Sequence, residues 1–172
     1  MMGVFSRLRA AIDEIRGKNR IDKFDFGVLQ TMMMLAAVDG EVSDEELAAF
    51  REMASECDGY SPESFTSLFR ATLRSAGYLL LLSRVLSRDE LVAAFVEEAE
   101  GPFIAKVSQK TAEVRGHAVS CLERMAKADG VFSECERACI DALARRVEEA
   151  HEATTAALCS AAAYYCSPTP RL

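Results

Sequence analysis

An acidic segment occurs twice in this chain of 172 residues, in the same residue pattern each time. The copies read Ala36-x-x-Asp39-Gly40-x-Val42-Ser43-x-x-Glu46 and Ala126-x-x-Asp129-Gly130-x-Phe132-Ser133-x-x-Glu136. A repeat at fixed register indicates that one supersecondary unit is used twice. The fold must therefore hold two equivalent corners, which an internal two-fold arrangement would bring together.

Each copy predicts a helix-turn-helix corner. The aspartate ends one helix, the glycine supplies a left-handed turn, the serine caps the next helix, and the glutamate completes a capping box. This does not explain Asp39 or Asp129, because a carboxylate at the carboxyl end of a helix faces the negative pole of the helix dipole, at about 0.3–1 kcal/mol. We expect a positive charge to offset that cost.

The composition predicts an all-α fold. Nine Gly and four Pro are few, and no strand-like run of alternating Val, Ile and Thr occurs. The length fits one domain with a substantial core. We expect a single-domain helical bundle of about 7–9 helices with an internal pseudo-two-fold repeat of the acidic corner. Its parts are an amphipathic helix in residues 1–22, the helical domain in residues 23–166 and a frayed tail in residues 167–172.

Several helix boundaries follow from local signals. We expect one helix from about Phe24 to Val38, and Gly77 is expected to end or kink a later one. Gly101 and Pro102 are expected to precede a long helix that reaches Ala128. A separate alanine-rich helix is expected from about Glu152 to Tyr165.

The first residues form an apolar stripe at helical spacing, made by Met1, Phe5, Leu8, Ile12 and Ile15. Residues 1–16 are therefore expected to pack on their own domain, or to dock on a membrane surface or a partner protein. The longest apolar run is far below the roughly 20 residues that cross a bilayer, and no secretory signal is evident. We expect a cytoplasmic location.

The charge disfavours nucleic acid as a partner. The formal net charge is 20 − 27 = −7, and residues 1–23 carry +3, which leaves the rest at −10. The six cysteines are expected to be free thiols. Cys135 and Cys139 lie one helical turn apart, so they are either buried small residues or the thiols of a redox or metal-resistance enzyme. No phosphate loop, His-Glu-x-x-His pair or nucleophile elbow occurs, so no enzyme is predicted.

The corners carry the oxygen ligands that hard cations such as Ca²⁺ and Mg²⁺ prefer. The first corner holds five carboxylates (Asp39, Glu41, Asp44, Glu45, Glu46), and the second holds three (Asp129, Glu134, Glu136). The first corner matches the second half of an EF-hand loop, but Leu35 and Ala37 stand where that loop needs acidic ligands. A cation would therefore be shared between corners. The alternative is a solvated acidic surface.

The two motifs resemble the tellurite-resistance TerB family and the related amino-terminal domain of the membrane-anchored DnaJ-like protein DjlA. The resemblance covers roughly residues 3 to 150. It implies a divalent-cation site that carries over to Asp39, Glu46, Asp129 and Glu136. The other carboxylates of the two corners, Glu41, Asp44, Glu45 and Glu134, are additional candidates, and we expect Ca²⁺ to be favoured over Mg²⁺ or Mn²⁺. This chain departs from the family in Cys135 and in the extension beyond Ala150.

The resemblance implies a non-enzymatic adaptor in tellurite resistance or a metal-stress response, with a protein partner near the inner membrane. One alternative is a metal-independent helical module that docks on a protein or a membrane. Another is the thiol-based enzyme.

Overall fold

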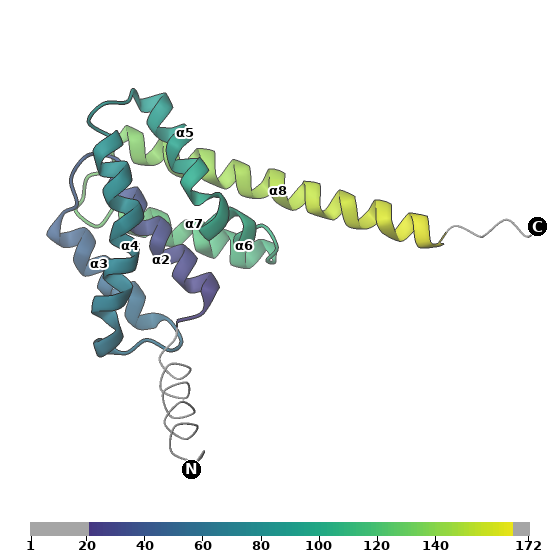
Figure 1. Cartoon of the computed structure of the whole chain (residues 1–172), viewed down its shortest axis with the longest axis horizontal. Coiled ribbons are helices and arrows are strands. Elements are labelled where there is room, and N and C mark those ends of the chain that lie inside the picture. The colour runs from purple at the N-terminus through teal and green to yellow at the C-terminus, as the bar shows by residue number, and fades with distance from the viewer. Residues whose placement is uncertain (1–20, 167–172) are drawn as a thin grey trace, which may run out of the picture.

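The computed structural model describes residues 21–166, and all regular structure in this range is helical (Figure 1). The elements are α2 (Lys23–Ala36), α3 (Asp44–Glu56), α4 (Pro62–Leu82), α5 (Arg88–Ala99), the π-helix η1 (Glu100–Ile104), α6 (Ala105–Val107), α7 (Ala112–Ala126) and α8 (Glu134–Cys166). The predicted all-α fold is confirmed. Six of these helices have 12 residues or more, fewer than the predicted 7–9. The helix predicted within residues 1–22 and the tail at 167–172 lie outside the described range.

Helix α2 is the centre of the core. It packs against each of the other helical elements within the described range. Residues Met32, Met33, Met34 and Leu35 are at most 1% exposed, so this helix is apolar on all sides over its second half. The methionine run is therefore core packing. Because α2 is enclosed, the corner at its end is held at a fixed place in the fold.

Helix α5 continues into η1 without a break. The Ala105 backbone N–H donates to the Glu100 carbonyl, five residues earlier, which is the π-helical pattern. The prediction that Gly101 and Pro102 separate two helices is wrong, because the wider π turn accommodates the proline. The Pro102 carbonyl packs so closely on α2 that a Cβ placed on Gly27 would lie 1.9 Å from its oxygen.

The prediction of one long helix that reaches Ala128 is also wrong. Helix α6 ends at Val107, and Thr111 begins α7 by accepting a hydrogen bond from the Val114 N–H (3.4 Å). Ile104 and Val107 are buried in the same core as Ala118 on α7. The apolar periodicity of the sequence therefore continues across the turn between α6 and α7 and does not indicate that turn.

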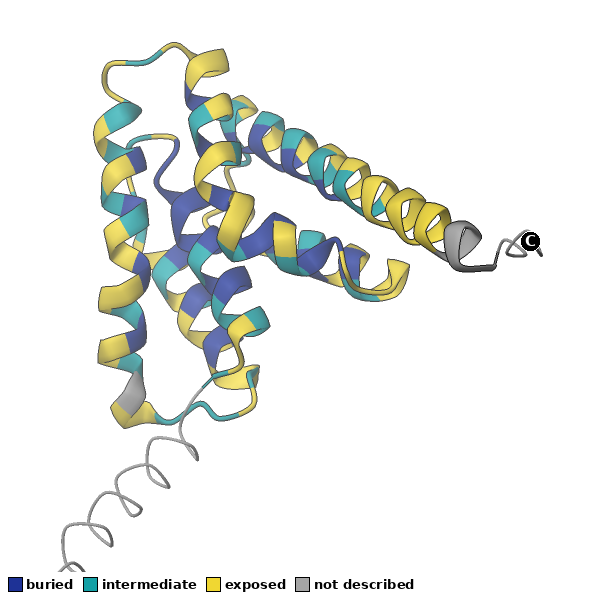
Figure 2. Cartoon of the chain, turned by 45° about the vertical axis from the view of Figure 1, so that its right-hand side comes forward, coloured by how far each residue is buried: buried dark blue, intermediate teal, exposed yellow. Residues whose placement is uncertain are grey.

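Helix boundaries elsewhere follow the caps. Helix α4 begins at Pro62 and runs through Gly77, which was expected to end or kink a helix and where an added Cβ would meet nothing within 4 Å. Helix α8 is one continuous helix of 33 residues, where two were predicted. Its residues 152–161 are exposed, and this part extends away from the bundle (Figures 1 and 2). No helix of the described chain is long and apolar enough to cross a membrane.

Candidate functional site

The two acidic segments form the same corner. Helices α2 and α7 each end in a turn whose glycine has a positive φ, +97° at Gly40 and +82° at Gly130. The Gly40 N–H donates to the Ala37 carbonyl at 3.3 Å, and the Gly130 N–H donates to the Lys127 carbonyl at 3.2 Å. The sequence repeat is thus a structural repeat at this scale.

Each aspartate stabilises its own turn. Asp39 Oδ1 accepts a hydrogen bond from the Glu41 N–H (3.1 Å), and Asp129 Oδ1 accepts one from the Val131 N–H (2.8 Å). Such bonds from a side chain to the backbone two residues ahead are common in turns. They give each aspartate a role in its own turn, which the capping motif in the sequence did not explain. They use one carboxylate oxygen and supply no positive charge.

The glutamates complete the two capping boxes from buried positions. The Ser43 N–H donates to Glu46 Oε2, and the Ser133 N–H donates to Glu136 Oε2, both at 2.8 Å. The reciprocal bonds, from the glutamate N–H to the serine Oγ, are 3.1 Å in both corners. Glu46 is 4% exposed and Glu136 is 2% exposed. Carboxylates so deeply buried are normally paired with a cation.

Electrostatic interactions show that the corners lie close together. Burial raises the pKa of Asp39, and the charge on Asp129 in the other corner raises it further. Burial also raises the pKa of Glu46, to about 7, and the charges on Asp39 and Glu136 add to the shift. The pKa of Glu136 is raised by burial and then by Asp39 and Asp129. Because these interactions weaken with distance, the fold brings all four predicted carboxylates into one neighbourhood.

The expected offsetting cation is not a side chain of the described residues. None of the four carboxylates takes part in an ion pair within that range. The nearby basic groups are engaged elsewhere. Lys127 pairs with Glu123 at 2.9 Å, and Lys127 and Arg137 both lie over the Phe132 ring, 5.1 and 4.8 Å from its centroid.

The donor chemistry fits a hard cation, although the ligands are not preassembled. Among the described side chains, no three His, Cys, Asp or Glu groups already stand where they could hold a metal ion. The corner hydrogen bonds use one oxygen of each carboxylate, so the second oxygen lies outside them. A bound cation would therefore require adjustment of the side chains.

The remaining candidate carboxylates lie around this neighbourhood. Glu41, Asp44, Glu45 and Glu134 are all exposed. Glu134 makes a loose ion pair with Arg88, at 3.6 Å between Nη1 and Oε2. These four residues are less suited than the buried pair to a dehydrated cation site, because water already solvates them.

The structure also places a cysteine beside the acidic corners. The pKa of Cys135 is raised mainly by burial and also by the charges on Asp39 and Glu136. Its position next to the first corner depends on the tertiary fold, so the repeat alone gave no signal for it. Cys139 is fully buried, and burial raises its pKa too. Both environments disfavour the thiolate that the alternative thiol enzyme would need.

Comparison with known proteins agrees with the resemblance seen in the motifs. The model of a family described as tellurite resistance protein TerB matches residues 25–159, which include both corners and all four carboxylates. No curated protein and no solved structure matches the chain. Because the match covers more than half of the chain, this protein belongs to the TerB family of tellurite resistance proteins.

Proposed function

We propose that this protein is a non-enzymatic adaptor that binds a divalent cation between its two acidic corners, in tellurite resistance or a related metal-stress response. One observation carries the proposal: burial and the neighbouring charges of the two corners, that of Asp129 included, raise the pKa values of Asp39, Glu46 and Glu136, and no basic side chain of the described chain pairs with any of the four carboxylates. A cation would remove this repulsion.

Asp39 and Glu46 from the first corner, with Asp129 and Glu136 from the second, would hold the ion. Ca²⁺ is favoured over Mg²⁺ or Mn²⁺, because Ca²⁺ tolerates irregular oxygen ligation, whereas Mg²⁺ demands near-ideal octahedral geometry. The ion would supply positive charge and a mechanical link between the two corners.

Such a link would control the surface offered to a partner. One corner joins α2 to α3 and the other joins α7 to α8, so bridging them fixes two helix pairs relative to each other. We infer that a protein partner at the cytoplasmic face of the inner membrane binds the surface that this arrangement of helices presents. Ligand binding of this kind acts by favouring one of two arrangements.

Titration calorimetry with Ca²⁺, Mg²⁺ and Mn²⁺ tests the proposal. We expect wild type to bind Ca²⁺ most tightly, and we expect Asp39→Asn combined with Asp129→Asn to abolish the heat. Glu46→Gln should also abolish it. Absence of heat for all three ions with wild type would end the proposal.

A third capping box provides the matched control. At the start of α5 the Ser87 N–H donates to Glu90 Oε2 at 2.9 Å, as in the acidic corners. Glu90 is exposed, and its pKa is lowered by its bonds to Ser87, with no contribution from any of the four carboxylates. Glu90→Gln should therefore weaken a helix cap without changing Ca²⁺ binding.

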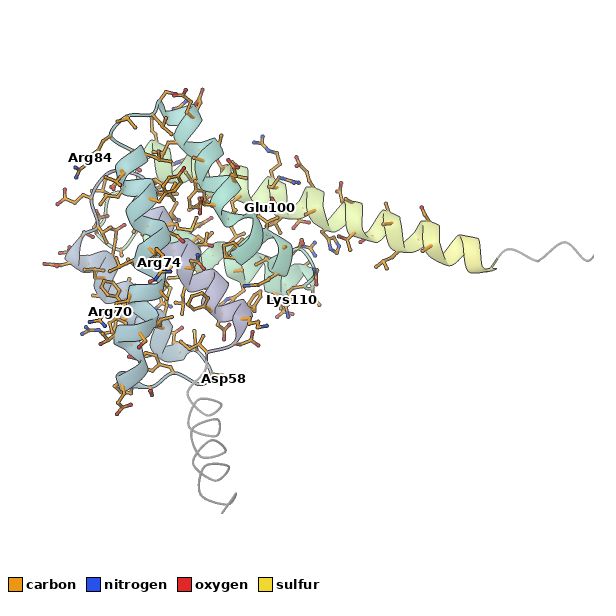
Figure 3. The ribbon with its side chains drawn as sticks, viewed as in Figure 1. Asp58, Arg70, Arg74, Arg84, Glu100 and Lys110 are labelled. Atoms are coloured by element: carbon orange, nitrogen blue, oxygen red, sulfur yellow. The ribbon has the colours of Figure 1, made fainter. Side chains whose placement is uncertain are left out.

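A metal-independent docking module is the second candidate, favoured by the exposed side of α4. Leu73, Tyr78 and Leu81 are 38–65% exposed there. Arg70 and Arg74 lie on the same helix and Arg84 follows it (Figure 3). This mixed surface would suit an acidic protein partner. Under this reading, neither EDTA nor added Ca²⁺ changes the unfolding temperature, whereas a bridging cation would raise it.

A further inference from the structure

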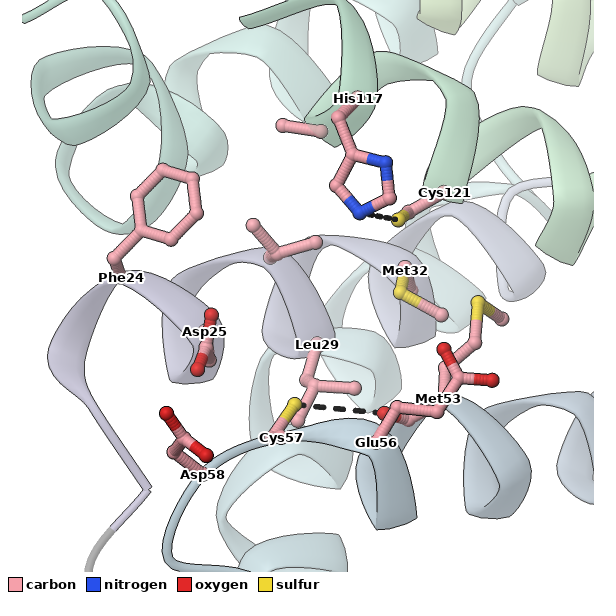
Figure 4. A pocket seen from close by; sticks show the side chains of 12 residues that line it. Phe24, Asp25, Leu29, Met32, Met53, Glu56, Cys57, Asp58, His117 and Cys121 are labelled. Carbon is pink, nitrogen blue, oxygen red and sulfur yellow. Dashed lines mark hydrogen bonds between the residues drawn. The ribbon is translucent and has the colours of Figure 1, made fainter. Parts of the chain in front are cut away.

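A cavity of about 300 Å³ lies between α2, the end of α3 and α7, and sulfur atoms gather around it (Figure 4). Two thiols and two thioethers line it, from Cys57, Cys121, Met32 and Met53. Thiolate and thioether sulfurs are the ligands that soft metal ions such as Cu(I) prefer. The composition of the cavity wall therefore indicates soft-metal chemistry.

On α7, a nitrogen ligand stands beside one of the thiols. His117 and Cys121 lie one helical turn apart, and His117 Nε2 is 3.7 Å from Cys121 Sγ. Bonds of about 2.0 Å to an imidazole nitrogen and about 2.3 Å to a thiolate, as zinc makes, can span that separation around a single ion. Helix α7 therefore presents two ligands at a spacing that suits one metal ion.

The other sulfur ligands come from α2 and from the end of α3. Met32 and Met53 are 1% and 5% exposed, so their thioethers are held by packing at the cavity wall. Burial raises the pKa of the Cys57 thiol to about 12, and the charges on Asp25 and then on Cys121 add to the shift. Because such interactions weaken with distance, the two thiols lie close enough to act on the same occupant.

This set of side chains suits a soft ion better than zinc. Among the described residues, no three His, Cys, Asp or Glu groups stand where they could hold a metal ion, so a zinc cage is not assembled. Thioethers are outside the usual zinc ligands, whereas Cu(I) accepts them, and Met32 then joins His117 and Cys121. The Cys57 thiol donates to the Met53 carbonyl oxygen at 3.4 Å and would leave that weak bond to bind the ion.

A cation can reach these ligands and is favoured by the charge around them. Cys57 and Cys121 are partly exposed, and the cavity is far larger than the about 30 Å³ that a water molecule occupies. Asp25 and Asp58 line the same cavity, and neither forms an ion pair within the described residues. Their charges therefore favour a positive occupant over a neutral one.

We propose that Cu(I) binds in this cavity, held by Cys121 Sγ, His117 Nε2 and the Met32 thioether, with Cys57 as the second thiolate. Each thiol releases its proton to the solvent as its sulfur binds the metal. The ion keeps its oxidation state, so the step needs no electron donor or acceptor. This site does not rest on the proposed cation at the acidic corners, because none of the four corner carboxylates lines the cavity.

Competition for Cu(I) tests the site. The full chain, with its thiols reduced, is titrated without oxygen into the Cu(I) complex of bicinchoninate, whose absorbance falls as the protein takes the ion. We expect one Cu(I) per chain. Cys121→Ser, His117→Gln and Met32→Leu should each weaken binding by at least about tenfold, since even the partners of metal ligands are worth about 10–100-fold. A wild-type chain that takes no Cu(I) would refute the site.

Met32→Leu also guards against misfolding, because it nearly keeps the side-chain volume and removes only the sulfur. Met33→Leu is its matched control, since Met33 is buried on the same helix but does not line the cavity. Cys159→Ser, exposed on α8, should leave binding unchanged as well. Circular dichroism confirms that each variant is folded. Equal loss of affinity in Met32→Leu and Met33→Leu would contradict the proposed ligands.

X-ray absorption at the copper edge identifies the atoms bound to the ion. A shell of sulfur and nitrogen is expected, and a shell that lacks either element would overturn the assignment. Loss of binding in Cys135→Ser, with binding retained in Cys121→Ser, would move the ion to α8 and would overturn it too. Asp39→Asn combined with Asp129→Asn should abolish the Ca²⁺ heat and leave Cu(I) binding intact, so the two sites fail or stand separately.

Discussion

At the scale of single residues, the informative group is Glu46. Its pKa of about 7 lies above the ordinary value of 4.5, so the folded protein favours the protonated form. The stabilising contribution is therefore complete below pH 4.5 and is lost as the pH rises through 7. Glu136 contributes with the same sign, because its pKa is raised as well.

This shift predicts a pH-dependent response to Ca²⁺. A cation binds the deprotonated carboxylates, so we expect Ca²⁺ to raise the unfolding temperature strongly at pH 8 and weakly at pH 5. Unfolding is followed by calorimetry at both pH values, in EDTA and in Ca²⁺. Glu46→Gln should flatten the pH dependence in EDTA, and Glu90→Gln should not. An equal effect of Ca²⁺ at both pH values would argue against a site built on these carboxylates.

At the scale of helices, the contact between α2 and η1 depends on the absence of a side chain. A Cβ at position 27 would lie 1.9 Å from the backbone oxygen of Pro102. Gly27→Ala should therefore lower the free energy of unfolding by about 1–3 kcal/mol, because one backbone must move. Urea denaturation measures this change.

Gly116→Ala is the matched control for that contact. Gly116 lies inside α7, is exposed, and would place its Cβ more than 4 Å from any neighbour. Alanine should stabilise it by up to about 1 kcal/mol through helix propensity alone. If both substitutions stabilised the protein equally, the close approach of η1 to α2 would be wrong.

Helix starts and ends were predictable where a side chain marks them. Ser43 and Ser87 form the capping boxes that their spacing to glutamate indicates, and the turn at Gly40 follows from the same motif. The π-helix at Pro102 and the turn before Thr111 were not predictable, because tertiary packing keeps the apolar periodicity continuous there. In the same way, only the repeat in the sequence predicted that the corner carboxylates lie close together. The position of Cys135 beside Asp39 could be seen only in the folded structure.

At the scale of the whole molecule, the family match ends near the point where α8 leaves the bundle. The match stops at residue 159, and residues 152–161 are exposed on the projecting part of the helix. Before residue 152, polar contacts hold α8 against α7 and against the turn that precedes α7. Arg115 pairs with Glu148 at 2.7 Å, and His151 Nδ1 lies 2.8 Å from the Ser108 carbonyl oxygen.

These contacts predict where the chain can be shortened. Removal of residues 153–172 should leave the unfolding temperature of the bundle nearly unchanged, because the exposed residues of that stretch bury no core side chain. Removal of residues 148–172 should lower it clearly, since Arg115 is 9% exposed and would lose its carboxylate partner. Glu148→Gln in the full chain separates the loss of this pair from the loss of the helix, and it should reproduce part of the decrease. Thermal unfolding of the three variants, at one protein concentration and in EDTA, decides the matter. A large decrease on removing only residues 153–172 would show that the projecting helix contributes to the fold.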